Sequence, residues 1–120
     1  MNKAQLMASI GLYKPTIERV ESPLGVVYVR SMAGTALTEW QRQNRDNPVF
    51  PVRGQAIANC LCEEDGTRIG LSEAEVAAID RLDTAATEEI LQASFRVSKL
   101  TDEDKKAAEK NSAVQSGDSG

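Results

Sequence analysis

Residues 71–98, LSEAEVAAIDRLDTAATEEILQASFRVS, decide the fold of this 120-residue chain. Ser72 with Glu75 three residues later has the pattern of a capping box, so a helix is predicted to begin here. Apolar side chains then recur every three or four positions, the spacing of one face of an α-helix. Asp83-Thr84 predicts a break that divides the stretch into two helices. The stripe consists of Val76, Ile79, Leu82, Ala86, Ile90, Ala93 and Val97, flanked by Leu91 and Phe95.

The rest of the chain divides into a turn-rich first half and a helical second half. All four prolines lie in residues 1–51, whereas neither Pro nor Gly occurs between Leu71 and Asn111. Near the N-terminus, apolar residues at helical spacing predict a short helix ended by Gly11. The other predicted helices cover about residues 35–45, 53–62 and 101–110.

Residues 16–31 have the composition of a small β-hairpin. Two segments rich in β-branched residues flank the turn signal Ser22-Pro23-Leu24-Gly25. Two strands alone are marginal in water, so the hairpin must pack on helices or pair with another chain. We therefore predict a mainly α fold, with one domain over residues 1–111 and a disordered polar tail over residues 112–120.

Composition excludes several classes of protein. With 41% apolar and 27% charged residues the chain is typical of a soluble globular domain. The net charge is −4 and basic residues form no cluster, which argues against nucleic-acid binding. No apolar run has the length of a membrane span or of a signal peptide. Cys60 and Cys62, one residue apart, are predicted to be free and partly core-facing thiols, so we expect a cytosolic protein.

The residue types argue against an enzyme. The chain has no histidine, which removes the commonest general base and transition-metal ligand. Two cysteines do not complete a four-ligand zinc site. The acidic stretch Glu63-Glu64-Asp65-Gly66 lacks the flanking ligands of a calcium loop and is better explained as a turn. Phosphate-binding glycine motifs are absent. No catalytic, cofactor-binding or metal site is predicted.

Protein binding is the remaining class of function. Trp40 is predicted to lie in the core or to anchor a partner, with the core favoured. Periodicity alone cannot separate core from interface in the long stripe. The candidate partner-binding residues are Trp40, Leu82, Ile90, Leu91 and Phe95.

Four motifs occur in an order that resembles the tail assembly chaperones of long-tailed bacteriophages. Together they cover residues 14–111. The first is a β segment ending in a V-Y-V-R strand, the second an acidic D-G turn, the third the helix start after that turn, and the fourth a closing L-T-x-E-D…K-N pattern. In this chain they are Lys14–Val20 with Gly25–Met32, Cys62–Ile69, Leu71–Val76, and Ser98–Asp104 with Glu109-Lys110-Asn111.

The resemblance implies a non-catalytic role in the host cell cytoplasm. Proteins of this family bind the long tape measure protein, keep it soluble and help tail tube subunits polymerise around it, and they are absent from the mature virion. The resemblance also implies the tail tube protein and a longer, frameshifted form of the chain as further partners, and it leaves self-association open. The alternative from a different class is a small helical adaptor or regulatory module unrelated to phage tails.

Overall fold

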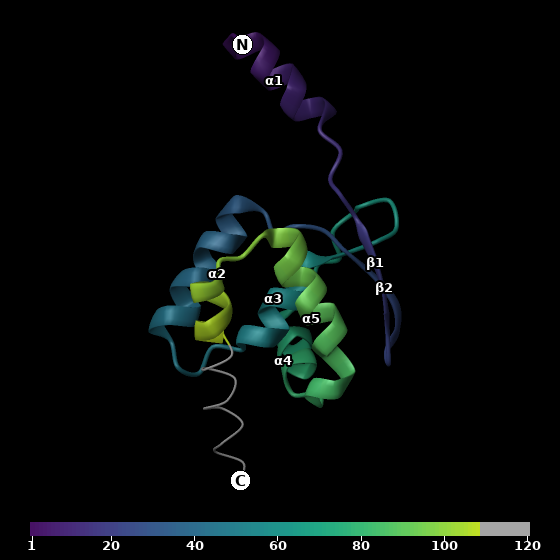
Figure 1. The fold of residues 1–120 in the computed structure, drawn as a ribbon, viewed down its shortest axis with the longest axis vertical. Coiled ribbons are helices and arrows are strands. Elements are labelled where there is room, and N and C mark those ends of the chain that lie inside the picture. The colour runs from purple at the N-terminus through teal and green to yellow at the C-terminus, as the bar shows by residue number, and fades with distance from the viewer. Residues whose placement is uncertain (109–120) are drawn as a thin grey trace.

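The structure, a computed structural model, describes residues 1–108 (Figure 1). It confirms a mainly α fold with a small β-hairpin near the N-terminus. The tail predicted over residues 112–120 lies outside the described residues. The elements are α1 (Lys3–Leu12), β1 (Glu18–Ser22), β2 (Gly25–Val29), α2 (Gly34–Asp46), α3 (Val52–Cys60), β3 (Leu61–Cys62), α4 (Glu73–Asp80) and α5 (Thr84–Ser98), followed by a helical segment over residues 102–108.

The sheet has three antiparallel strands in the order β1-β2-β3. The third strand is a correction to the sequence analysis, which extended the preceding helix to Cys62. The helix ends at Cys60, and Leu61 pairs instead with Val29 of β2. This pairing forms hydrogen bonds with backbone groups of β2 that would otherwise be unpaired on that edge of the sheet. The need to pair them outweighs the helical spacing of the local sequence.

The hairpin turn is built by the predicted Ser22–Gly25 signal. Gly25 has φ of +112°, a conformation that side chains with a Cβ rarely adopt. The Ser22 hydroxyl donates to the Gly25 carbonyl at 2.8 Å and accepts from the Leu24 N–H at 3.2 Å. The hairpin packs on α5, as expected from the instability of two strands alone.

The predicted division of residues 71–98 into two helices is confirmed. Ser72 and Glu75 form the capping box at the start of α4, with both reciprocal hydrogen bonds present. The chain leaves the helix after Asp80 and resumes at Thr84. The final helical segment also begins as predicted, because the Thr101 hydroxyl accepts from the Asp104 N–H at 3.1 Å.

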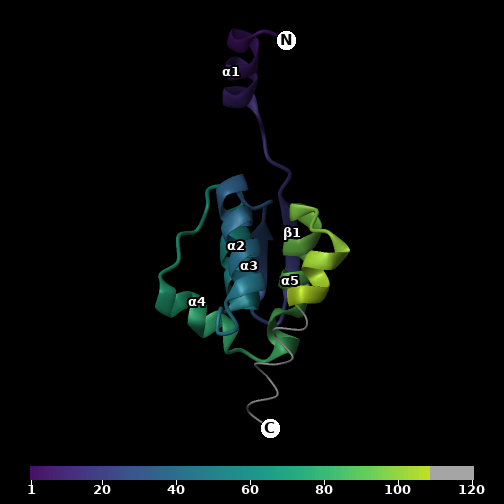
Figure 2. The same cartoon turned by 90° about the vertical axis from the view of Figure 1, so that its left-hand side faces the viewer.

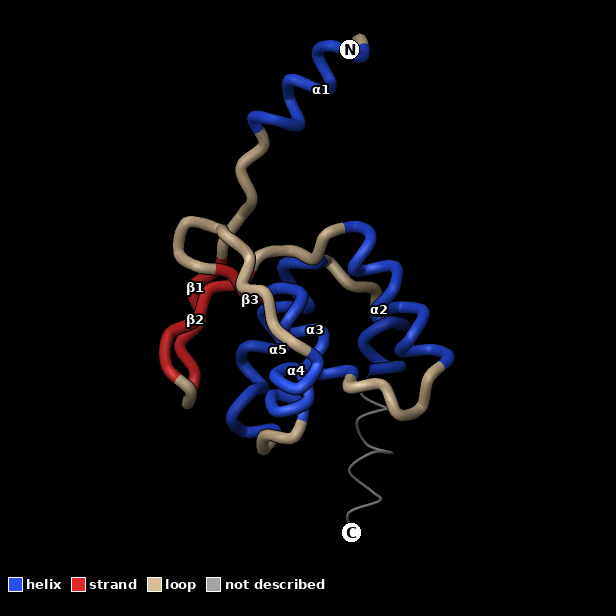
Figure 3. Tube along the Cα trace, turned by 180° about the vertical axis from the view of Figure 1, so that it is seen from behind, coloured by secondary structure: helices blue, strands red, loops and turns tan. Residues whose placement is uncertain are grey.

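The core lies between the sheet, α2, α3 and α5 (Figures 2 and 3). Trp40 of α2 donates its indole N–H to the carbonyl of Val52 at 3.0 Å, which joins α2 to the start of α3. Its ring lies 6.0 Å from that of Phe95, tilted by 59°. This is within the range of favourable edge-to-face contacts, so a residue from α2 and one from α5 close the same core.

Helix α1 stands away from this body (Figures 1 and 2). It lies at one end of the longest dimension of the molecule, which measures 56 Å against 32 and 26 Å for the other two. The helix predicted here is confirmed, but it continues through Gly11 to Leu12. A glycine costs about 1 kcal/mol in a helix interior relative to Ala, which does not force the helix to end.

Candidate partner-binding surface

The structure places four of the five predicted partner-binding residues inside the core. Trp40, Ile90, Leu91 and Phe95 are each at most 3% exposed. Leu82, in the connection between α4 and α5, is 40% exposed. The periodicity of the sequence did not decide whether these residues belong to the core or to an interface. In this structure the four buried side chains pack the helices together. Contact between them and a partner stays a prediction, one that requires the core to open.

Exposed apolar side chains are concentrated on and beside α1, away from the core. Along residues 1–108, most of the exposed large apolar side chains belong to α1 or flank it. They are Met1, Leu6, Met7, Ile10, Leu12 and Tyr13. Clustered apolar surface of this kind typically marks a contact site with another macromolecule.

Helix α1 has an apolar face that nothing in the described chain covers. At 100° per residue, Leu6, Met7 and Ile10 fall within one arc of about 100°, whereas Gln5 and Leu12 fall on the opposite side of the helix. No residue of the helix is buried. An isolated helix of ten residues is marginal in water, so α1 gains little stability until its apolar face meets a partner.

A capping box fixes the start of α1. The Gln5 N–H donates to the Asn2 side chain at 2.8 Å, and the Asn2 N–H donates to the Gln5 side chain at 2.8 Å. The sequence analysis missed this pair, although Asn followed three residues later by Gln is a recognisable capping signal. The helix therefore has a defined beginning even though no other element supports it.

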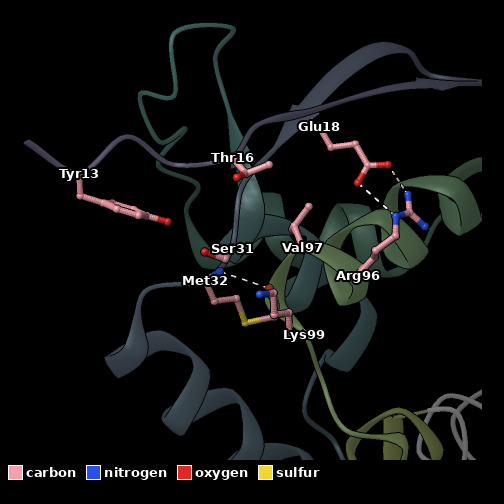
Figure 4. A pocket seen from close by; sticks show the side chains of 9 residues that line it. Tyr13, Thr16, Glu18, Ser31, Met32, Arg96, Val97 and Lys99 are labelled. Atoms are coloured by element: carbon pink, nitrogen blue, oxygen red, sulfur yellow. Dashed lines mark hydrogen bonds and ion pairs between the residues drawn. The ribbon is translucent and has the colours of Figure 1, made fainter.

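A pocket of about 540 Å³ lies at the root of α1, between the segment that leaves the helix and the C-terminal end of α5 (Figure 4). Tyr13 and Thr16 line it from the connecting segment, and Met32 and Val97 contribute apolar surface. The Met32 N–H donates to the Ser98 hydroxyl at 3.2 Å, which holds the segment after β2 against α5.

One side of the pocket is held by an ion pair. Arg96 of α5 contacts the carboxylate of Glu18 at the start of β1 through two guanidinium nitrogens (Figure 4). The hydrogen bond to Glu18 raises the pKa of Arg96 above its ordinary value. The pair fixes the place where the segment from α1 joins the sheet.

The surface around α1 is positively charged. Residues 1–17 contain Lys3 and Lys14 and no acidic residue, whereas residues 18–108 carry eleven basic and sixteen acidic residues, a balance of −5. Among the described residues, neither of these lysines nor Lys99 at the pocket forms an ion pair with a carboxylate. Their charges are therefore available to carboxylates of a partner.

The other motifs singled out in the sequence have structural roles here. Cys60 and Cys62 are free and buried, and burial raises the pKa of both thiols. In the acidic turn, Gly66 has φ of +93° and the Asp65 carboxylate accepts from the Thr67 N–H at 2.9 Å. Within residues 1–108 no group of three or more His, Cys, Asp or Glu side chains is placed to hold a metal ion. The helices of the same part of the chain are too short or too polar to cross a bilayer.

Fold and surface together define a small, mainly helical protein in which most of the exposed large apolar side chains lie on or beside a protruding helix. No family model matches the chain, and no curated protein matches its sequence. A solved structure, that of the bacteriophage HK97 tail assembly chaperone, is similar to this chain with a TM-score of 0.52. The alignment covers 82% of this chain and 99% of that chain, at 17% sequence identity. The resemblance inferred from the sequence is thus confirmed at the level of the fold.

Proposed function

We propose that this protein is a tail assembly chaperone that binds the tape measure protein of its phage, keeps it soluble and helps recruit tail tube subunits. The observation that carries the proposal is the likeness of fold to the HK97 tail assembly chaperone, which extends over 99% of that chain. The ordered motifs in residues 14–111 support it independently, because they were identified from the sequence alone.

The surface supports the same role on physical grounds. A long helical client with exposed apolar faces aggregates unless a partner covers them. Helix α1 offers an uncovered apolar face, and the negative balance of residues 18–108 favours solubility of the complex. Several copies bound along one client add avidity without a tight single site.

The proposal includes where and when the protein acts. As a chaperone of assembly it works in the host cell cytoplasm and leaves before the virion is complete. The tail tube protein and a longer frameshifted form of the chain are its further proposed partners, and self-association is compatible with the role.

Co-expression with the tape measure protein of the same phage tests the function. We expect the tape measure protein to move from the insoluble to the soluble fraction and to co-purify with the tagged chaperone. A small acidic helical protein of unrelated fold, expressed in the same way, controls for non-specific solubilisation. If the client stays insoluble while this protein is folded, the chaperone role is wrong and the adaptor alternative gains ground.

A further inference from the structure

We infer that α1 and the pocket at its root form the docking surface for one helix of the tape measure protein, a helix whose apolar stripe is flanked by carboxylates. The inference rests on the proposed function and names the part of the chain that carries it. It differs from the sequence-based candidates, since all but one of those side chains lie in the core.

Helix α1 is formed, but no other element of the described chain supports it. Its start is capped by the Asn2 and Gln5 hydrogen bonds, and Leu6, Met7 and Ile10 on its apolar face are about half exposed, at 49–58%. Burying such a side chain from full exposure is worth about 1.5–3 kcal/mol, and each of these three has about half of its surface left to bury. A second helix laid along this face therefore recovers a large free energy that the isolated chain forgoes.

The lysines around α1 favour a client with negative charges. Lys3 lies in the first turn of α1 and Lys14 follows its C-terminal end, so the apolar face has a cation at each end. Neither lysine forms an ion pair within residues 1–108. A client helix with a carboxylate at each end of its apolar stripe pairs with both lysines, whereas a client helix with cations at these ends is repelled.

The end of α1 and the pocket share a residue. Tyr13 is the C-cap of α1 and also lines the pocket, together with the apolar side chains of Met32 and Val97 (Figure 4). Lys99 lies at the same pocket and adds a third cation. A client helix that lies along α1 would therefore reach this pocket with one end, where an apolar side chain and a carboxylate of the client can bind.

The test uses the full chain and the full-length tape measure protein. The variant Leu6→Gln with Ile10→Gln replaces two of the three apolar side chains of this face with residues that still favour helix. Its matched control is Leu24→Gln with Val49→Gln, which changes two apolar side chains that are equally exposed or more so and lie far from α1 in the chain. We expect capture of the client to fall about tenfold or more for the α1 variant and to stay unchanged for the control.

Charge reversal gives a second readout. Lys3→Glu with Lys14→Glu should weaken capture severalfold at low salt, and the deficit should shrink at about 0.5 M NaCl because screening removes the repulsion. Lys105→Glu with Lys106→Glu, at two lysines of the C-terminal helical segment that are not buried, changes the net charge by the same amount and is its control. An equal loss in the control would overturn the assignment of these charges to the docking surface.

The outcomes separate the inference from the function on which it rests. Helicity and thermal midpoint should be the same for all variants, because no changed side chain is buried. Undiminished capture by the Leu6→Gln, Ile10→Gln variant would overturn the α1 inference and leave the chaperone role standing. A wild-type protein that captures no client would overturn both. Two further results would overturn the inference in favour of another occupant: an α1-dependent change in oligomeric mass, or α1-dependent binding to phosphatidylcholine and phosphatidylglycerol vesicles, each with client capture intact.

Discussion

Gly54 of α3 and Asp80 of α4 are joined by a hydrogen bond in which the Gly54 N–H donates to the Asp80 carboxylate at 3.0 Å. Asp80 is the last residue of α4, and its carboxylate lies at the N-terminal turn of α3. The N-cap residue of α3, Pro51, provides no side-chain cap. A carboxylate is unfavourable at the C-terminus of a helix and favourable at the N-terminus of another. The two helices meet closely enough that a Cβ on Gly54 would lie 2.5 Å from the Val76 carbonyl oxygen.

Substituting Gly54→Ala should destabilise the protein by about 1–3 kcal/mol. Alanine ordinarily stabilises a helix relative to glycine, by about 1 kcal/mol, so a loss must come from the crowded contact between α3 and α4. Urea denaturation followed by circular dichroism measures it. Gly34→Ala is the control, because a Cβ at Gly34 meets no atom within 4 Å. Equal effects of the two substitutions would contradict the close helix packing.

By capping α3, the Asp80 carboxylate should add about 1 kcal/mol to the free energy of unfolding. Asp80→Ala removes the acceptor, so the midpoint of urea denaturation should fall with an unchanged slope. Asp80→Asn keeps an oxygen that can accept from Gly54 and should lose less. If Asn is as damaging as Ala, the charge and not the hydrogen bond is what stabilises α3.

Local signals predicted much of this fold. The start of α4 at Ser72 and the break before Thr84 depend on side chains within a few residues of the backbone groups they satisfy. The strand at Leu61 escaped prediction because its conformation depends on pairing with Val29, distant in sequence. Helical spacing was present there, and long-range pairing outweighed it.

The candidate surface was harder to predict than the fold. Periodicity shows that Leu6 and Ile10 share a helix face, but it does not show whether another element covers that face. The same limit applied to the long stripe, where Leu82 is exposed and Ile90 is buried. Only the packing of α5 against the sheet and α3 separates those two positions. The lack of acidic residues in residues 1–17 was the available signal that this segment differs from the rest.

Replacing Lys99, which follows α5, with glycine should stabilise the protein. Lys99 has φ of +53°, in the left-handed region. The Lys99 N–H donates to the Arg96 carbonyl at 3.2 Å, and the Leu100 N–H donates to the Phe95 carbonyl at 3.2 Å. These two hydrogen bonds form a Schellman motif. Lys99→Gly should stabilise the protein by about 0.5–1 kcal/mol, because the strain relieved exceeds the entropy that glycine loses on folding.

Lys99→Ala is the matched control for that gain. It removes the same charge but keeps the Cβ, so the strain at φ of +53° remains. Thermal denaturation of the three proteins distinguishes the causes. A gain of the same size for Ala would show that the lysine charge, and not the backbone conformation, limits stability.

The ion pair between Arg53 and Glu88 should make a pH-dependent contribution to stability. The Arg53 guanidinium donates to the Glu88 carboxylate at 2.8 Å and lowers the pKa of Glu88 below its ordinary value. Because the folded-state pKa is the lower one, the contribution is fully present above the unfolded-state pKa and is lost as pH falls through the folded-state value. Glu88 is 48% exposed, so solvent screening limits the contribution to about 1 kcal/mol or less.

Glu88→Gln should therefore destabilise the protein at pH 7 but not once the pH is low enough to protonate Glu88 in the folded state. The measurement is urea denaturation of wild type and variant at several pH values between these limits. Glu89→Gln is the control, since Glu89 forms no ion pair with another described residue. A penalty at Glu88 that does not change with pH would contradict the ion pair as its source.

The two cysteines should be protected from alkylation in the native protein, and to different degrees. Cys60 is 0% and Cys62 2% exposed, and burial raises the pKa of both thiols, so little reactive thiolate is present. Cys60 lies against α5, where its thiol donates to the Ser94 carbonyl at 3.8 Å. Cys62 belongs to a two-residue strand at the edge of the sheet, where only a bridge to Arg68 adds to the pairing with β2.

Short edge strands open more readily than packed helices, so iodoacetamide should label Cys62 before Cys60. Mass spectrometry of digested samples over time measures the order, and the same reaction in urea gives the rates of the unfolded chain. We expect both native rates to lie far below the urea rates. If Cys60 is labelled first, α3 and α5 separate before the strand does, and the junction between these helices is the weak point of the fold.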